Sequence, residues 1–463
     1  MFDSQIIYRH KNIYMDSVEN YLFIYNPLSR KGLTLLNEPS AYLFKLIDNK
    51  RTIKDIYQLA QKKDESVRLL SVKKIFDDFL NSEIICLDPL KSMQKYVKKK
   101  QKHLSIWFHI TNQCNLRCKY CYIWKTPSKI TNDIAKQAIK KILVDAKKHN
   151  FEKVEIKFSG GECLLELKKL LTLVNLGNKI AKKIGIYIRF VVLTNGTLLS
   201  KKTALILKKY NIDVCVSLDG LGKYNDTQRI FKDGSGTFES IEKGIKNLLL
   251  HQVSFNVIVT ITLKNVKNLS ELTQYLLKHK INFVFNFYRE NPCVQDDLRV
   301  ANKILIFYLK KVYKLIFHNP PYHNIMGNLD KINLNNPHLL SCGIGKNYML
   351  IRHDGKITTC QMTIDQPIGS INDEDIIETM RKGNFIRPKR LTVEDKTPCK
   401  NCQWRYACCG GCPLLTYNQK GCFTTNSPYC EVYKALIPDI LRVEAQRIIK
   451  YGFKFKHANL IKV

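Results

Sequence analysis

Short apolar runs alternate with helical patterns between residues 104 and 290. Six of the runs are rich in β-branched and aromatic residues, which is typical of strands. They cover residues 104–110, 154–158, 186–193, 214–218, 255–262 and 283–288. Between the first two runs, apolar residues from Ile134 to Ala146 recur at the spacing of one helix face. Alternating strands and helices predict an α/β fold with a parallel sheet, and six strands predict a partial (β/α)6 barrel rather than a closed eight-stranded one.

The first hundred residues have a different pattern. Strand-like pieces at 21–25 and 32–36 precede an expected Asn-Glu-Pro-Ser turn at 37–40, and two helical patterns follow. Thr52 stands where the second of these helices is expected to begin. Residues 90–103 are rich in lysine and glutamine and form the expected linker to the barrel.

At 463 residues the chain is too long for one ordinary core, because a typical domain has about 150 residues. Its formal net charge of +35 would suit nucleic acid, since a basic surface attracts phosphates. The lysines are spread along the chain, however, and the densest run, at 98–100, lies in the expected linker. No nucleic-acid recognition module is apparent in the sequence. The charge suits an acidic peptide equally well and does not favour nucleic acid as a partner.

The beginning of the chain carries no charged segment followed by an apolar stretch, and no apolar run reaches the length of a membrane span. We therefore expect a soluble, cytoplasmic protein without a membrane span. In that reducing compartment, sixteen cysteines indicate metal or cluster ligation rather than a disulfide framework.

Three of the cysteines, Cys114, Cys118 and Cys121, form a C-x3-C-x2-C loop directly after the first predicted strand. Three thiolates on one tight loop can bind three irons of a 4Fe-4S cluster and leave the fourth iron open to a small molecule. A structural zinc site would need four ligands, and a disulfide would need an oxidising compartment. A cluster is therefore favoured over both alternatives.

Residues 110–122 (ITNQCNLRCKYCY) resemble the signature of the radical SAM enzymes. The resemblance implies that the three cysteines are catalytic. In that family their cluster passes one electron to S-adenosylmethionine and generates a 5'-deoxyadenosyl radical, which abstracts hydrogen from unactivated carbon. It also implies an external electron donor such as flavodoxin or ferredoxin, and it places Tyr120, next to the last thiol, in the cofactor site.

Residues that follow the second predicted strand extend this resemblance. Gly160, Gly161 and Glu162 stand there, where paired glycines let the backbone approach a ligand and the carboxylate can bind an ammonium group. In radical SAM enzymes this segment contacts the amino group of S-adenosylmethionine. Cys163 stands where relatives usually have proline, and we interpret it as a small apolar substitution.

The next two strand ends also match the family. Asn195 follows the third predicted strand, Ser217 lies at the end of the fourth, and Arg229 comes twelve residues later. The resemblance implies that all three bind the cofactor, with Ser217 and Arg229 at its ribose and carboxylate end. A guanidinium is the natural bidentate partner of a carboxylate. Taken singly, the serine fits a helix N-cap and the arginine a solvated side chain, but the matches occur in order at successive strands.

Seven cysteines in the last third of the chain match the pattern of the SPASM domain, an auxiliary-cluster module of peptide- and protein-modifying radical SAM enzymes. The C-x2-C pair alone would also fit a zinc ribbon. By the resemblance, an outer auxiliary cluster is bound by Cys399, Cys402, Cys408 and Cys430. An inner one is bound by Cys342, Cys360 and Cys412. The expected cofactors are therefore S-adenosylmethionine and three 4Fe-4S clusters.

The inner cluster is expected to be one protein ligand short, and we hypothesise that its open iron binds a substrate thiolate. Cys409 and Cys422 lie near enough in sequence to serve instead. Gln361 stands where sulfatase-maturing relatives have a proton-accepting aspartate. An amide cannot act as a general base, so formylglycine production is not expected. Four further cysteines also lie outside both patterns and are expected to be small buried apolar residues: Cys86, Cys163, Cys215 and Cys293.

Residues 35–56 resemble the PqqD-like peptide recognition element, a winged-helix-like domain that adds the leader of a precursor peptide to its sheet edge as a strand. A nucleic-acid-binding winged helix is the alternative. Apolar positions between 436 and 448 recur with a helical period. We expect four parts: a PqqD-like domain at 1–95, a radical SAM core at 104–310, a SPASM domain at 340–435 and a helical tail at 436–463.

Together these features predict a radical SAM maturase that modifies a ribosomally synthesised precursor peptide carrying a leader. The open inner cluster favours a thioether between cysteine sulfur and carbon, as in sactipeptide- and ranthipeptide-type synthases. Carbon-carbon crosslinking is a close alternative, and epimerisation, with Cys293 as hydrogen donor, is less favoured. Alternatives from other classes are a cluster-bearing regulator that binds nucleic acid and a radical enzyme that acts on a small molecule.

Overall fold

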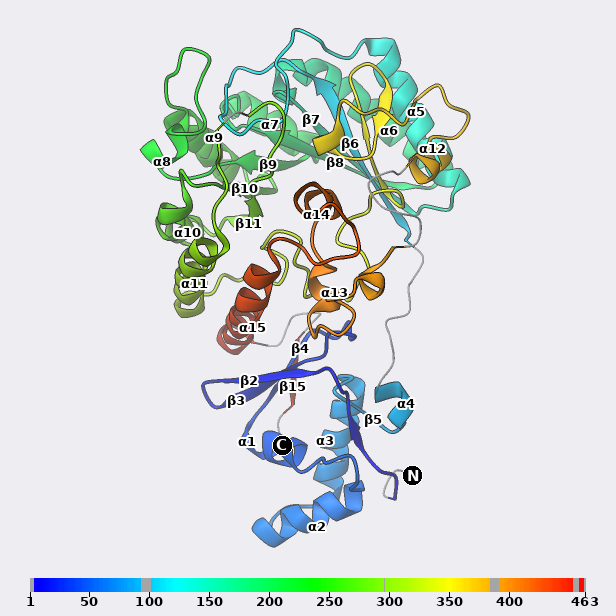
Figure 1. The fold of residues 1–463 in the computed structure, drawn as a ribbon, viewed down its shortest axis with the longest axis vertical. Helices are drawn as coiled ribbons and strands as arrows, with labels where there is room; N and C mark the ends of the chain where they lie inside the picture. Colours follow the sequence, from blue (N-terminus) through cyan, green and yellow to red (C-terminus); the bar gives the residue numbers. More distant parts are fainter. Residues whose placement is uncertain (1–3, 93–100, 295, 384–390, 453–457, 462–463) are drawn as a thin grey trace.

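The computed structural model describes residues 4–92, 101–294, 296–383, 391–452 and 458–461 (Figure 1). Most of the predicted linker, including its lysine run at 98–100, lies outside these residues. Within the described part of the chain, no helix is long and apolar enough to cross a membrane.

The six predicted strands are confirmed, and their ends lie within two residues of the expected ones. All six run parallel and lie side by side in chain order. They are β6 (His103–Thr111), β7 (Lys153–Gly160), β8 (Tyr187–Thr194), β9 (Asp213–Ser217), β10 (Phe255–Ile261) and β11 (Asn282–Phe287). Their carboxyl ends therefore meet at one edge of the sheet, which is where parallel α/β folds bind ligands.

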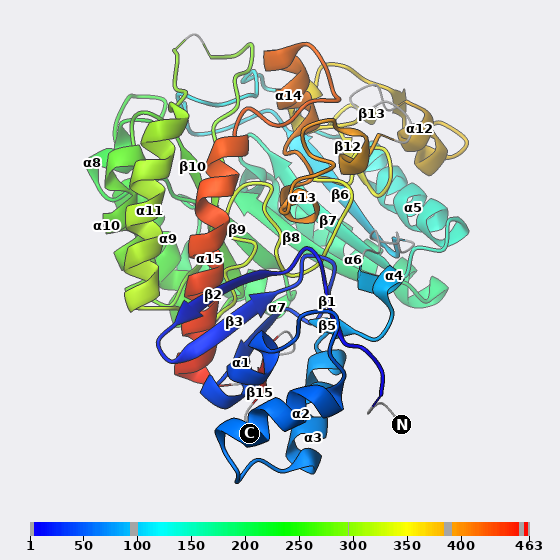
Figure 2. The same cartoon turned by 60° about the horizontal axis from the view of Figure 1, so that its bottom comes forward.

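Helices that connect the strands lie along the outer face of the sheet (Figures 1 and 2). They are α5 (Asn132–Lys148), α6 (Leu167–Ile184), α7 (Lys201–Lys209), α9 (Phe238–Leu250), α10 (Leu269–Lys278) and α11 (Asn302–His318). In α5, Thr131 caps the first turn by accepting a hydrogen bond from the Ile134 amide. The apolar face predicted for this helix is buried against the sheet, as Ile139 and Ile142 show.

The sheet is longer than the predicted six strands. β12 (Tyr348–Ile351) pairs parallel with β6, and β13 (Lys356–Thr358) and β14 (Gly369–Ser370) continue the same edge in antiparallel pairing. These strands have two to four residues, too few to show a period of two in the sequence. The cysteine-rich segment is thereby joined to the barrel through the backbone hydrogen bonds of β6.

The first ninety residues form a smaller sheet with its own core. β2 (Tyr14–Val18), β3 (Tyr21–Tyr25) and β4 (Leu33–Leu36) are antiparallel neighbours. A short pair, β1 (Tyr8–Arg9) and β5 (Ile85–Cys86), lies beside them. The core is filled by helices that follow the strands: α1 (Glu38–Lys45), α2 (Ile53–Lys63) and α3 (Leu69–Asn81), with α4 (Pro89–Ser92) beyond them. Figures 1 and 2 show this group at one end of the molecule.

One expectation for this region was right and one was wrong. Thr52 begins α2, in a capping box with Asp55. The expected turn at 37–40 is instead the start of α1, because the Asn37 side chain accepts a hydrogen bond from the Ser40 amide and proline occupies the first turn.

The end of the chain combines a helix with a strand. α15 (Cys430–Tyr451) starts before the predicted 436 and packs against α11. The predicted helical tail is wrong beyond it, because β15 (Ala458–Ile461) pairs parallel with β4 of the small sheet. The remaining helices are short: α8 (Lys223–Asp226), α12 (Ile376–Lys382), α13 (Arg405–Cys408) and α14 (Pro413–Lys420).

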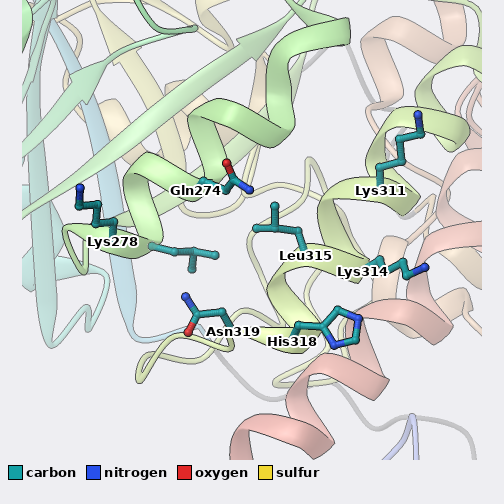
Figure 3. Close-up of a pocket in the computed structure, with 8 residues that line it drawn as sticks. Gln274, Lys278, Lys311, Lys314, Leu315, His318 and Asn319 are labelled. Atoms are coloured by element: carbon teal, nitrogen blue, oxygen red, sulfur yellow. The ribbon is translucent and has the colours of Figure 1, made fainter.

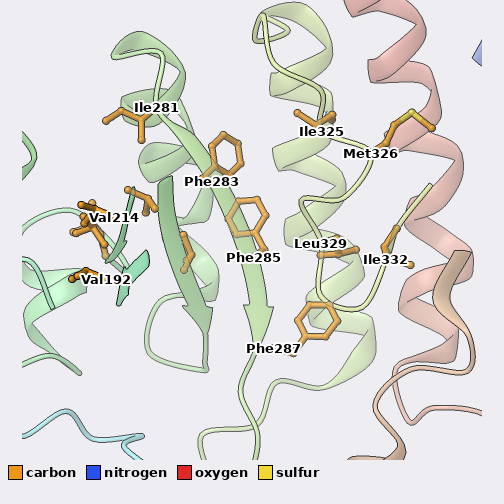
Figure 4. Packing of buried hydrophobic residues seen from close by; sticks show 14 of the residues in the cluster. Val192, Val214, Ile281, Phe283, Phe285, Phe287, Ile325, Met326, Leu329 and Ile332 are labelled. Carbon is orange, nitrogen blue, oxygen red and sulfur yellow. The ribbon is translucent and has the colours of Figure 1, made fainter. Parts of the chain in front are cut away.

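Residues 325–332 form no strand but pack against β11 and extend the barrel core. Phe285 of β11 and Leu329 are both almost wholly buried and face each other, with Met326 beside them (Figure 4). The Phe285 amide donates to the Asn328 carbonyl at 2.8 Å, so the segment follows the strand edge. This packing fixes the position of the two residues that come next, Asp330 and Lys331.

Candidate active site and cluster-binding residues

The cysteine loop after β6 is held by backbone hydrogen bonds on two sides. Arg117 and Lys119 donate their amides to the carbonyls of Ile230 and Gln228, each at 2.8 Å. On the other side, the Gly161 amide donates to the β6 end at 2.7 Å. The loop that presents the three thiols is therefore positioned by two separate strand-end segments.

Gly160 and Gly161 lie directly against this loop. A Cβ added to Gly161 would come within 2.0 Å of the Gln113 carbonyl oxygen, and one added to Gly160 within 2.3 Å of the Thr111 carbonyl oxygen. Gly160 also has φ = +150°, a conformation that side chains disfavour. The glycines are required here by the close approach of two backbones.

Glu162 and Asn195 connect the next strand ends to the loop. Glu162 is fully buried and accepts hydrogen bonds from the Asn195 amide at 2.8 Å and the Thr194 hydroxyl at 2.9 Å. Burial raises the pKa of Glu162, although these hydrogen bonds oppose the shift. The Asn195 side chain donates to Asn115 in the cysteine loop at 2.9 Å. The ends of the second and third barrel strands are therefore connected to the cysteine loop by hydrogen bonds.

Tyr120, Asp219 and Arg229 form a buried polar group beside the thiols. The Tyr120 hydroxyl donates to Asp219 at 2.5 Å and also contacts the Arg229 guanidinium, which lies 3.4 Å from the same carboxylate. Asp219 was not predicted as a site residue, although its place directly after the fourth strand was a usable signal. Ser217 lies nearby at the end of β9.

The donor set of this edge fits the expected cofactors. The pKa of Cys118 is raised to about 12, mainly by burial and also by the neighbouring thiols Cys121 and Cys114, although Arg229 opposes the shift. Three close thiolates of this kind are stabilised by a cationic centre such as iron. The buried Nε of Arg229 has no hydrogen-bond partner among the described residues, so it is available to an anionic ligand group.

Four cysteines predicted to hold the outer cluster face one small cavity. The cavity has a volume of about 40 Å³, and all four thiols line it: Cys399, Cys402, Cys408 and Cys430. Burial raises the pKa of Cys408 to about 12, and the Cys399 and Cys402 thiols add to the shift. The four side chains therefore converge, as a cluster that is fully ligated by protein requires.

Two of the three inner cysteines each line a larger cavity. Cys342 lines a cavity of about 620 Å³ and Cys412 lines another of about 420 Å³. Burial raises the pKa of Cys360 to about 12, with the Cys412 and Cys342 thiols adding to it. Cys409 does not face this set, because its thiol donates to the His338 carbonyl at 2.8 Å.

Buried positive charge surrounds the inner set. Arg289 makes a bidentate ion pair with Asp330, at 2.8 and 2.7 Å, and lines the same cavity as Cys412. Lys331 lines the other cavity, beside Cys342. Burial alone would raise the pKa of Cys412, but Arg289 and Lys331 outweigh it and the pKa is lowered. Neither cation was identified from the sequence, because no motif contains them.

A further cavity of about 610 Å³ lies on the outside of the barrel between α10 and α11 (Figure 3). Its lining includes Lys278, Lys311 and Lys314 and no residue of the predicted sites. In the described residues, no three histidine, cysteine or acidic side chains are grouped closely enough to hold a single metal ion.

Comparison with known proteins identifies the class. Residues 108–276 match the model of the radical SAM superfamily, and residues 342–403 match that of SPASM, an iron-sulfur cluster-binding domain. The chain belongs to the radical SAM superfamily and has a SPASM domain at its C-terminal side. Its cofactors are S-adenosylmethionine and 4Fe-4S clusters, auxiliary clusters included.

Three relatives illustrate the similarity. An uncharacterized protein of Methanocaldococcus jannaschii is 30% identical over 211 residues, which cover 44% of this chain and 70% of the relative. A cysteine-type anaerobic sulfatase-maturating enzyme of Clostridium perfringens is 23% identical, covering 69% and 91% of the two chains. The crystal structure of Streptococcus suis SuiB bound to its precursor peptide SuiA superimposes with a TM-score of 0.53, at 17% identity, covering 92% and 100%.

Proposed function

We propose that this radical SAM enzyme modifies a ribosomally synthesised precursor peptide, and that it forms a thioether between a cysteine sulfur and a carbon of another residue. The observation that carries the proposal is the inner cysteine set. It has three thiols, the thiol of Cys409 donates elsewhere, and two of its cysteines each line a cavity. A fourth ligand can therefore come from a peptide thiolate. For each crosslink the thiol loses its proton, the carbon loses a hydrogen atom to the 5'-deoxyadenosyl radical, and the one electron left over would be accepted by the auxiliary cluster.

At the carboxyl edge of the barrel, each predicted residue has a proposed role. When bound by Cys114, Cys118 and Cys121, the cluster and S-adenosylmethionine supply a 5'-deoxyadenosyl radical for hydrogen abstraction. Glu162 accepts hydrogen bonds from the amino group of S-adenosylmethionine, to which the adjacent glycines allow a close approach.

The buried group beside the thiols holds the other end of the cofactor. The free Nε of Arg229 donates to the carboxylate of S-adenosylmethionine, while Asp219 keeps the guanidinium and the Tyr120 ring in place. Asn195 fixes the cysteine loop through Asn115, and Ser217 faces the ribose end. An external donor such as flavodoxin or ferredoxin supplies the electron.

The larger of the two cavities suits a peptide path. It extends from Arg30 in the small N-terminal sheet region to Cys342 of the inner set, and its lining is mainly polar and basic. Gln361 lies at the inner set, where its amide oxygen accepts a hydrogen bond from Tyr348 at 3.0 Å. Since an amide is not a general base, the proposed reaction differs from that named for the sulfatase-maturating relative.

The N-terminal unit is proposed to bind the leader, as a PqqD-like element does. A leader that adds a strand needs a free sheet edge. In the order β15-β4-β3-β2, the β4 edge is paired with β15, so β2 offers the edge at the other side. SuiB, whose fold covers 92% of this chain, was crystallised with its precursor peptide.

Epimerisation is a second candidate, favoured by the position of one spare thiol. The Cys293 amide donates to the Asn291 side chain at 3.1 Å, and Asn291 in turn donates to the Tyr120 carbonyl at 3.4 Å. Cys293 is therefore held next to the cysteine loop, where a thiol can donate hydrogen to a peptide radical.

Mass spectrometry separates these reactions. A short peptide encoded beside this gene, chosen as the candidate precursor, is co-expressed anaerobically with the wild-type enzyme and with Cys114→Ala as the control. The proposal predicts the loss of two hydrogens and of one alkylatable thiol per crosslink, with the wild-type enzyme only. The same mass loss with every thiol intact indicates carbon-carbon crosslinking. An unchanged mass in ordinary water, together with a gain of deuterium when the reaction is run in heavy water, indicates epimerisation.

A further inference from the structure

Lys125 lies four residues after the last cysteine of the loop and turns inward. Its Nζ is 3.0 Å from the Cys121 sulfur, and its side chain is half-buried, whereas the preceding Trp124 is 58% exposed. Lys125 was not among the site residues predicted from the sequence. The lysine contact with a cluster-ligand sulfur is therefore additional to the predicted site.

The segment that follows Lys125 is hydrogen-bonded to the cysteine loop, so the backbone that carries the lysine is held in place. The Asn112 amide donates to the Ser128 carbonyl at 2.9 Å, and the Asn112 side chain donates to the Thr126 hydroxyl at 3.0 Å. The Gln113 side chain donates to the Pro127 carbonyl at 2.7 Å. Three hydrogen bonds thus hold residues 126–128 beside the start of the loop.

The contact partner of Lys125 is a thiol rather than a carboxylate. Within the described residues, Lys125 makes no ion pair with an acidic side chain. Its positive charge is therefore directed at the sulfur of Cys121, one of the three cluster ligands.

Reduction of a 4Fe-4S cluster adds one negative charge, with no bond made or broken. The electron comes from the external donor, which is oxidised. A fixed positive charge and a hydrogen bond to a ligand sulfur stabilise the reduced form more than the oxidised form, and hydrogen bonds to sulfur are known to set cluster potentials. The half-buried position strengthens the effect, because solvent screens the charge less than at the surface.

We propose that Lys125 is a positioning residue of the cluster bound by Cys114, Cys118 and Cys121. Its ammonium group donates to the Cys121 sulfur and raises the reduction potential of that cluster, so that an external donor reduces it more readily. The inference rests on the proposed cluster-binding role of the loop and does not depend on which peptide is modified.

The test is an EPR-monitored redox titration of the fully reconstituted enzyme without S-adenosylmethionine or peptide. The triple variant Cys114→Ala, Cys118→Ala, Cys121→Ala supplies the signal of the auxiliary clusters, which is subtracted. Lys125→Met is expected to lower the midpoint potential of the loop cluster, Lys125→Gln to lower it less, and Lys125→Arg to leave it near the wild-type value. Lys119→Met, an exposed lysine on the same loop, is the matched control and is expected to have no effect.

Iron content and binding of S-adenosylmethionine are measured on the same samples. An unchanged potential in Lys125→Met with full iron content overturns the inference. So does weaker binding of S-adenosylmethionine at an unchanged potential, because Lys125 would then contact that cofactor instead. If Lys125→Met loads iron poorly, Lys125→Gln and Lys125→Arg decide the question by the same criteria. Failure of peptide modification leaves the titration unaffected, so the two proposals fail separately.

Discussion

Replacing Gly161 with alanine should inactivate the enzyme through the backbone of the cysteine loop. The new Cβ would lie 2.0 Å from the Gln113 carbonyl oxygen and 2.5 Å from its carbonyl carbon, both of them backbone atoms. Ordinary contact begins at 3.4 Å, so the loop or the strand end must move by about 1.4 Å. Overpacking of this kind costs about 1–3 kcal/mol, and a misplacement of about 1 Å at a reacting centre costs on the order of 100-fold in rate.

The assay compares two alanine variants. Gly234 lies in an exposed turn with φ = +89°, and an added Cβ there meets nothing within 4 Å. Gly234→Ala should therefore cost only about 1–2 kcal/mol of backbone strain and leave catalysis unchanged. Formation of 5'-deoxyadenosine, iron content and chemical unfolding are measured for both. The reasoning is refuted if Gly161→Ala binds a full complement of iron and forms 5'-deoxyadenosine as fast as Gly234→Ala.

Three further predictions follow from buried charges. Asp219→Asn should raise the Kd for S-adenosylmethionine about 10- to 100-fold, because Arg229 loses its charged partner and hydrogen bonds to charged groups contribute about 1.5–3 kcal/mol. Isothermal titration calorimetry measures the Kd, and an unchanged Kd would show that the pair is merely structural. Arg447→Met should lower the free energy of unfolding by about 3–5 kcal/mol, because the wholly buried carboxylate of Glu444 loses its ion-pair partner. Urea unfolding of the apoprotein measures this free energy, and a loss under about 1 kcal/mol would contradict the prediction. At Asp375, burial raises the pKa, but hydrogen bonds from Lys148 of α5 and from His149 directly after this helix hold the pKa well below the usual range, so this group stabilises the fold above about pH 4 and the gain is lost as pH falls. Asp375→Asn should therefore lose less stability than the wild type between about pH 5 and pH 3, and equal losses in thermal unfolding would refute this.

The barrel strands were predictable because each is long and apolar enough to show its pattern. β6 to β11 have five to nine residues, β9 to β11 bury alternate side chains, and the helices between the strands have a clear period. β12, β13 and β14 were missed because pairing with β6, rather than their own sequence, makes them strands. The start of α1 was missed because Asn37 and proline are signals of both turns and helix starts.

For the site, motif spacing located residues that lie on one loop or at a strand end. The outer cysteines converge on one cavity, as their pattern implied. Contacts between residues that are far apart in the chain could not be predicted from the sequence. Tyr120 and Asp219 are 99 residues apart, and Arg289 and Asp330 are 41 apart, so both pairs depend on how the barrel closes around them. Lys125 depends on the path of a loop that no periodicity specifies.

The most direct test of the central claim follows a hydrogen atom from the peptide to the cofactor. The precursor peptide encoded beside the gene is prepared with deuterium at its carbon positions and incubated anaerobically with reconstituted enzyme, S-adenosylmethionine and a reductant. We expect 5'-deoxyadenosine that is one deuterium heavier than in a reaction with unlabelled peptide, and no product with Cys114→Ala. Formation of 5'-deoxyadenosine without deuterium, and with the peptide unchanged in mass and configuration, would contradict the proposal that this enzyme acts on that peptide.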